Sequence, residues 1–221
     1  MHIYLLTIIF LLSLCVLNSL KPSKYYSYVG FLILFIIAAF RSVEIGNDLK
    51  GYVQLFISGQ AQIGLKGNLE WGYTIISDIL QQFSDKPSWY IFSTSFLIFV
   101  PLCILISKKS NNPIFSILIF FVLINGFGFS LTAIRQYMAV VLSLWGFHYF
   151  ENKRYLYSIV LIIIASSIHS SALFCILFLL VSIIIKKKRK LYLLLIISVL
   201  IGFIGRLNIF DILPFFNRLP G

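Results

Sequence analysis

Long apolar runs separated by short polar segments dominate this chain. The runs cover residues 2–19, 25–40, 89–107, 113–132, 133–150, 155–167, 170–185 and 191–207. They are continuous rather than periodic, and continuous apolar runs are what a lipid bilayer requires of a spanning helix. The pattern predicts an all-α fold: a polytopic integral membrane helix bundle of about eight transmembrane helices, forming a single transmembrane domain over residues 1–221.

Some segments of this pattern allow other interpretations. The first run lacks a basic start and a small-residue cleavage site, which favours a retained helix over a signal peptide. Several runs are shorter than the roughly 20 residues of a perpendicular span, so re-entrant segments are an alternative around 125–128 and around His169. The one long polar segment, 41–88, holds five of the seven acidic residues and predicts a long outer loop between helices 2 and 3.

Composition supports a membrane location. The mean hydropathy is +0.98, 60% of the residues are hydrophobic and 11% are charged, so a soluble domain would expose too much apolar surface. An aggregation-prone fragment of a soluble protein is the disfavoured alternative. Cys15, Cys103 and Cys175 are far apart within apolar runs, which indicates core residues rather than a metal site or disulfides. We expect no metal and no cofactor.

The net charge of +11 has a topological explanation. If the turn after the first run is cytoplasmic, alternation places eleven basic residues on that side against one acidic residue, and seven basic against six acidic residues on the other. This asymmetry follows the positive-inside rule and predicts both termini outside. Most of the positive charge is then explained, so we expect no nucleic-acid partner.

Polar residues that the topology does not require lie on the predicted outer side. Arg41 opens the outer loop, followed by Asp48 in a Gly-Asn-Asp turn and by Tyr52. One interpretation is an arginine–carboxylate cluster at the mouth of a cavity, where it would orient a polar ligand. A plain loop, with Arg41 extending to the lipid headgroups, is the alternative.

A second cluster places the carboxylate of Glu70 beside Trp71 and Tyr73. Aromatic faces with a nearby acid are suited to holding sugar rings, although aromatic anchors at the membrane interface have the same composition.

Arg135 and Gln136 give the strongest polar signal, because they lie just inside the start of the fifth run. A guanidinium at that depth indicates pairing or a wet cavity, and its planar fork suits phosphate or carboxylate; a headgroup contact is the alternative. His169 interrupts an apolar stretch where two spans turn. It is a candidate general base or phosphate contact, or a structural residue of the turn.

Other chemistry-bearing patterns are absent from the sequence. It contains no Gly-rich phosphate loop followed by Lys and Ser or Thr, no Cys/His metal set and no nucleophile elbow. The predicted cytoplasmic loops are also too short for a nucleotide-binding domain, which argues against a cytoplasmic reaction driven by ATP or a nucleotide sugar.

The order of these motifs resembles the EpsG family of Wzy-like polysaccharide polymerases. The resemblance covers residues 41–172. It rests on four motifs in this order: Arg41 before a Gly-Asn-Asp…Tyr stretch, Glu-Trp-Gly-Tyr starting at Glu70, Arg-Gln…Ala starting at Arg135, and His-Ser-Ser-Ala starting at His169. The family pattern is usually longer, with more spans after the histidine. The ending at Leu-Pro-Gly therefore favours a truncated or inactive member.

The resemblance implies an enzyme of the bacterial cytoplasmic membrane that joins polyprenyl-diphosphate-linked repeat units at the outer face, in capsule, exopolysaccharide or O-antigen synthesis. It implies that Arg135 and Arg41 bind the diphosphate and that His169 or Asp48 takes the acceptor proton. Glu70 and its neighbouring aromatics would hold sugar, with Gln136 and Tyr52 as further contacts. Other polysaccharide-assembly proteins are candidate partners besides the glycan substrate and the bilayer.

Three rival functions use similar residues. A transporter or flippase of lipid-linked sugars would need charge in the middle of the bundle, and the predicted spans carry charge only at their ends. A membrane-bound acyltransferase would be expected to take its donor from the cytoplasm, whereas His169 is predicted outside. A non-catalytic partner in polysaccharide assembly is the third alternative.

Overall fold

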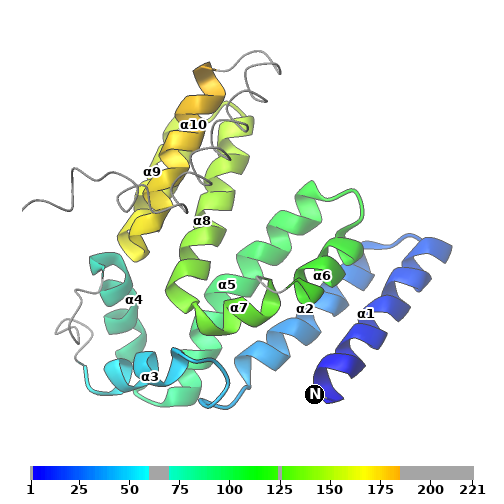
Figure 1. Ribbon diagram of the computed structural model, residues 1–221, viewed down its shortest axis with the longest axis horizontal. Coiled ribbons are helices and arrows are strands. Elements are labelled where there is room, and N and C mark those ends of the chain that lie inside the picture. The colour runs from blue at the N-terminus through cyan, green and yellow to red at the C-terminus, as the bar shows by residue number, and fades with distance from the viewer. Residues whose placement is uncertain (1, 60–69, 124–125, 185–221) are drawn as a thin grey trace, which may run out of the picture. The chain divides into compact units, whose positions relative to one another are not determined.

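The computed structural model describes residues 2–59, 70–123 and 126–184 of the 221-residue chain, and all regular elements in these ranges are helices. They are α1 (His2–Leu20), α2 (Lys24–Ala39), α3 (Leu49–Ile57), α4 (Trp71–Gln81), α5 (Pro87–Lys109), α6 (Pro113–Val122), α7 (Phe127–Thr132), α8 (Ile134–Glu151), α9 (Tyr155–Ile168), the 3₁₀-helix η2 (Ser170–Leu173) and α10 (Phe174–Ile184) (Figure 1). The predicted all-α class is thus confirmed for the described part of the chain. The predicted eighth run, 191–207, lies outside it.

The chain divides into two compact units, residues 1–176 and 177–221. The first unit holds all candidate site residues. The single transmembrane domain expected from the sequence stays a prediction.

Two of the described helices are long and apolar enough to cross a membrane. They are α1, with 19 residues, and α5, with 23 residues. The apolar helices α2, α6 and α9 are shorter than 18 residues, so the predicted bundle of eight spans is not confirmed. The predicted fourth run is broken into α6 and α7 near Gly126, where a Cβ atom would lie 1.9 Å from the carbonyl oxygen of Phe120.

Local sequence signals set the helix starts. Ser23 caps α2 by accepting a hydrogen bond from the backbone N–H of Tyr25, and Asn112 caps α6 in the same way. Pro87 and Pro113 occupy the first positions of α5 and α6, where a missing N–H has no cost. These caps divide the apolar runs into separate helices.

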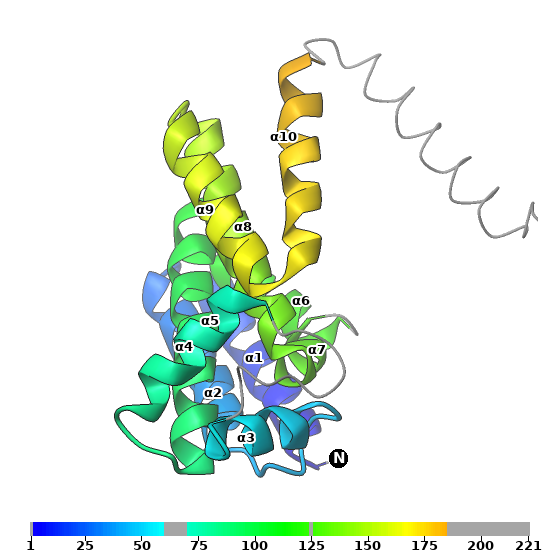
Figure 2. The same ribbon diagram turned by 90° about the vertical axis from the view of Figure 1, so that its left-hand side faces the viewer.

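The segment 41–88, predicted as an outer loop, contains the amphipathic helices α3 and α4 in its described part. The buried residues of α3 are Leu49, Val53 and Phe56, which share one helical face. The helix α3 packs on α4 and α5, and α4 also packs on α9. Figure 2 shows both short helices at the end of the first unit where α5 begins. This end is where the candidate residues gather.

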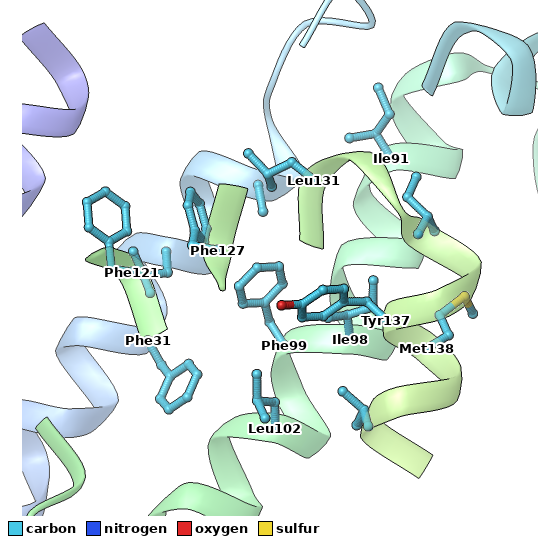
Figure 3. Close-up of a cluster of buried hydrophobic side chains, with 14 of the residues drawn as sticks. Phe31, Ile91, Ile98, Phe99, Leu102, Phe121, Phe127, Leu131, Tyr137 and Met138 are labelled. Carbon is cyan, nitrogen blue, oxygen red and sulfur yellow. The ribbon is translucent and has the colours of Figure 1, made fainter. Parts of the chain in front are cut away.

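Aromatic and aliphatic side chains from helices α1 to α9 form the core. Figure 3 shows Phe99 of α5 between Phe127 of α7 and Tyr137 of α8. The Tyr137 hydroxyl donates a hydrogen bond to the carbonyl oxygen of Gly126, at 2.9 Å. Apolar side chains gain little from leaving lipid, so close packing of this kind is what holds such helices together in a bilayer. The core fixes the start of α8, which carries Arg135.

Candidate functional site

The carboxylate of Glu70 is the centre of the candidate site. Glu70 is the N-cap residue of α4, but its side chain makes no cap hydrogen bond and contacts two other segments instead. Its Oε2 lies 2.5 Å from Nη1 of Arg135, and its Oε1 accepts a hydrogen bond of 3.1 Å from the backbone N–H of Ser170. One side chain therefore joins the starts of α4, α8 and η2.

Arg135 lies in the first turn of α8 and rests on two tyrosine rings. Its Nε donates to the hydroxyl of Tyr52 at 3.0 Å. The guanidinium carbon is 5.3 Å from the ring centroid of Tyr52 and 5.6 Å from that of Tyr73. Such cation–π contacts stabilise a partly desolvated guanidinium. About a fifth of the Arg135 side chain stays exposed, with a relative area of 21%, so it can meet a ligand.

His169 lies in extended backbone between α9 and η2, next to the same carboxylate. Its Nδ1 is 3.4 Å from Oε1 of Glu70, a distance that makes an ion pair when the imidazole is protonated. The contact does not meet hydrogen-bond geometry, and Nδ1 has no hydrogen-bond partner among the described residues. The backbone of His169 is held at both ends, by Ala165 and by Ala172. The backbone position of the imidazole ring is therefore fixed, and the Glu70 carboxylate places a negative charge beside it.

The environment of Glu70 keeps this carboxyl ionised. Partial burial by itself raises the pKa of Glu70, but the hydrogen bond from Ser170 and the positive charge of Arg135 act in the opposite direction. Together with His169 they outweigh burial, so the pKa lies below its usual value. At neutral pH the site contains a carboxylate paired with a guanidinium.

A close approach between α4 and α9 positions Glu70. Gly72 lies against the last turn of α9, where a Cβ atom would be 2.1 Å from Oγ and 2.7 Å from the carbonyl oxygen of Ser167. Only glycine fits this contact without a shift of one helix. The glycine of the Glu-Trp-Gly-Tyr motif is therefore a packing residue, a role that the sequence analysis missed.

Tyr73 packs its ring against the guanidinium of Arg135 and is buried. Its hydroxyl is 2.6 Å from the hydroxyl of Tyr90 in α5, and its side chain is 1% exposed. Burial raises the pKa of Tyr73 to about 12, so the hydroxyl stays neutral at physiological pH. Tyr90 was not identified from the sequence, because it lies within an apolar run.

The structure places Arg41 outside this cluster. Arg41 is 8% exposed; Nη1 donates to the carbonyl oxygen of Ala38 at 2.6 Å, and Nη2 donates to that of Leu131 at 3.1 Å. A longer bond of 3.3 Å reaches the hydroxyl of Ser95. Burial lowers the pKa of Arg41 to about 10, which still leaves it charged at neutral pH. In this structure Arg41 ties the ends of α2 and α7 to α5.

The remaining predicted residues make none of the contacts that define the cluster. Asp48 is exposed at the start of α3 and caps no backbone N–H there. Trp71 follows Glu70 directly and is 66% exposed, so its ring is open to a ligand. Gln136 lines a cavity of about 170 Å³ between α8 and the 171–175 segment, whose other lining residues are Ala139, Val140, Ser143, Leu144, Phe147, Ser171, Ala172 and Cys175.

The donor set of the site suits an anionic ligand better than a metal ion. Within the described ranges, no group of three or more His, Cys, Asp or Glu side chains lies close enough together to hold a metal. The cluster instead pairs one carboxylate with a guanidinium and an imidazole, over tyrosine rings. Such a set can bind a phosphate, stack a sugar and accept a proton.

The comparisons with known proteins agree with the motif order. The EpsG family profile matches residues 24–219, almost the whole chain. The comparisons with curated proteins and with solved structures gave no significant match. The family indicates a membrane protein of polysaccharide biosynthesis. The resemblance inferred from four short motifs is thus confirmed over a longer range, and the chain belongs to the EpsG family.

Proposed function

We propose that this protein joins polyprenyl-diphosphate-linked oligosaccharide repeat units at the outer face of the bacterial cytoplasmic membrane. The observation that carries the proposal is the contact network of Glu70, Arg135 and His169. Three motifs separated by up to 100 residues meet at one carboxylate. A cluster of this kind, partly exposed at one end of a helical membrane protein, suits a charged lipid-linked sugar.

In the proposed reaction, Arg135 binds the diphosphate of the donor. A guanidinium has five N–H donors, and two of those of Arg135 have partners among the described residues, namely Tyr52 and Glu70. The remaining three can meet phosphate oxygens and stabilise the negative charge of the leaving group. Gln136, on the next position of α8, is a further donor for the same group.

His169 acts as the general base in this proposal. A hydroxyl of the incoming unit attacks the anomeric carbon of the growing glycan, the new C–O bond forms, and the bond to the diphosphate breaks. The diphosphate leaves with the bonding electron pair, and the hydroxyl proton moves to Nε2 of His169. The carboxylate of Glu70, 3.4 Å from Nδ1, stabilises the resulting imidazolium. Atoms and charge balance without a cofactor.

Other predicted residues take supporting roles. The exposed ring of Trp71 is proposed to stack on a sugar ring beside Glu70. Arg41 is proposed to position the start of α8 through the carbonyl of Leu131 rather than to bind diphosphate itself. Asp48 is a less suitable base than His169, since its carboxylate is exposed and makes no cap hydrogen bond at the start of α3.

Chain length of the surface polysaccharide tests the proposal in cells. With Arg135→Ala, the long-chain products should collapse to single repeat units while the protein stays in the membrane at wild-type level. Lys50→Ala is the matched control, because Lys50 is an exposed basic residue outside the Glu70 cluster, with Glu44 as its ion-pair partner. A wild-type length profile with Arg135→Ala would refute the proposal. Loss of all surface glycan, single units included, would instead indicate a flippase.

A further inference from the structure

A second polar pocket lies at the other end of α8. Its volume is about 410 Å³, and its lining residues are Lys108, Trp145, His148, Tyr149, Asn152 and Arg154. The helical rise of about 1.5 Å per residue puts His148 about 20 Å from Arg135 along α8. The pocket, called here the Lys108 pocket, is therefore separate from the Glu70 cluster.

The lining of the Lys108 pocket carries positive charge without a compensating acid. Lys108 and Arg154 contribute two cations, and no lining residue is acidic. The nearest acid along the chain, Glu151, is engaged elsewhere, because its Oε2 lies 2.5 Å from Nζ of Lys109. A concave surface with this charge attracts anions.

Aromatic contacts fix one of the two cations. The Nζ of Lys108 lies 5.3 Å from the ring centroid of Trp145. The indole N–H of Trp145 donates to the carbonyl oxygen of Pro101 at 3.1 Å, which holds the ring in place. The ammonium of Lys108 therefore has a defined position at the pocket wall.

The turn after α8 fixes the backbone of Arg154, the residue that carries the other cation. Lys153 has φ = +61°, in the left-handed region that glycine normally occupies at a helix C-terminus. This conformation lets the backbone N–H of Arg154 donate to the carbonyl oxygen of Tyr149 at 2.9 Å. Arg154 is thus bound to the last turn of α8 rather than carried on a free loop.

We propose that the Lys108 pocket binds the phosphate of an anionic phospholipid headgroup. The pocket lies at the C-terminal end of α5, one of the two described helices long and apolar enough to cross a bilayer. Trp145 and Tyr149 have the amphipathic rings typical of the headgroup layer, and basic pockets at helix ends are suited to anionic headgroups. Its volume accommodates a phosphoglycerol group as well as the phosphate.

Lipid binding to the purified full-length protein tests this inference. Native mass spectrometry would measure the dissociation constants of phosphatidylglycerol and of phosphatidylcholine. We expect clear preference for phosphatidylglycerol and about 25-fold weaker binding in the double variant Lys108→Gln/Arg154→Gln, since each cation near an anionic headgroup contributes roughly fivefold. The single variant Lys108→Gln, at an exposed side chain, should weaken binding about fivefold and covers the case of a poorly folding double variant.

The matched control is Lys21→Gln/Lys24→Gln, which removes the same charge from the turn predicted to face the same side of the membrane. It should change the affinity less than about threefold, since neither lysine lines the Lys108 pocket and both act on the headgroup only through screened attraction. An equal loss in the control and the pocket variant would overturn the inference, because it would show attraction by bulk charge. Full displacement of the lipid by glycerol 1-phosphate or inorganic phosphate at similar concentration would also overturn it, by showing a site for soluble anions.

Discussion

Gly72→Ala should loosen the contact that positions Glu70. The added Cβ would lie 2.1 Å from Oγ and 2.7 Å from the carbonyl oxygen of Ser167, whereas ordinary contacts begin near 3.4 Å. A rotation of the Ser167 side chain relieves the first overlap but not the second, which involves backbone. The helices α4 and α9 must therefore separate by several tenths of an ångström.

The expected cost follows from these overlaps. Overpacking of a close helix contact typically costs about 1–3 kcal/mol, and the overlaps with the backbone oxygen and carbon of Ser167, at 2.7 and 2.8 Å, place Gly72→Ala near the upper value. The reduced freedom of the unfolded chain returns about 0.4–1 kcal/mol. The net destabilisation is then about 2 kcal/mol. The shift also stretches the 3.1 Å bond between Glu70 and Ser170, so polymer formation should fall at least tenfold.

Thermal unfolding of the detergent-purified protein, followed by tryptophan fluorescence, measures the first effect, and the glycan length profile measures the second. Gly51→Ala is the matched control, because Gly51 lies in α3 with no atom within 4 Å of an added Cβ. This control should raise the unfolding temperature slightly, in line with the roughly 1 kcal/mol helix preference of alanine over glycine. A Gly72→Ala variant as stable and as active as wild type would refute the close packing of α4 on α9.

Three further variants test individual contacts. Glu70→Gln should destabilise the protein at pH 7, and the difference should shrink in acid. The lowered pKa of Glu70 means that its contribution to stability is complete above the unfolded value, about 4.3, and disappears as pH falls through the lower folded value. The unfolding temperatures of wild type and variant should therefore converge as the pH falls below the unfolded value, and a constant gap would contradict the pairing. Tyr52→Phe keeps the ring next to Arg135 but removes the hydroxyl that accepts a hydrogen bond from Nε. Loss of this bond, worth about 1.5 kcal/mol, should lower the polymerisation rate about tenfold. An unchanged rate in a reconstituted assay would show that the bond has no role. Arg41→Ala should destabilise the fold by about 3 kcal/mol, because two buried carbonyl oxygens lose their hydrogen-bond donor. The amount of folded protein in the membrane should therefore drop. A stable, inactive variant would instead favour a direct role of Arg41 in binding substrate.

The helices of the apolar runs could be predicted from the sequence, because lipid selects for continuous apolar stretches that also form helices. The ends of α1, α5 and α9 differ from the predicted boundaries by two residues or fewer. The amphipathic helix α3 was missed, although Leu49, Val53 and Phe56 recur at helical spacing within the polar segment. The charged and polar residues of the whole segment 41–88 obscure that period.

The candidate site was predictable as a set of residues but not as a geometry. Arg135 and His169 stood out because polar groups within apolar runs require an explanation. Their meeting at Glu70 depends on the packing of α4 against α9, which no local pattern encodes. Arg41 has the same kind of sequence signal but is buried against Leu131, 90 positions further along the chain. A single sequence cannot distinguish a guanidinium that binds backbone carbonyls from one that binds a ligand.

Reconstitution of the purified protein with its lipid-linked substrate is the most direct test of the proposed catalytic cluster. Wild-type protein in proteoliposomes, supplied with a polyprenyl-diphosphate-linked repeat unit and no other protein, should form dimers and longer glycans and release polyprenyl diphosphate. The variant His169→Ala should form none while still binding the substrate, and His169→Gln should behave in the same way. Chain extension by His169→Ala at the wild-type rate would contradict the account, as would a wild-type protein that binds the substrate and never joins two units.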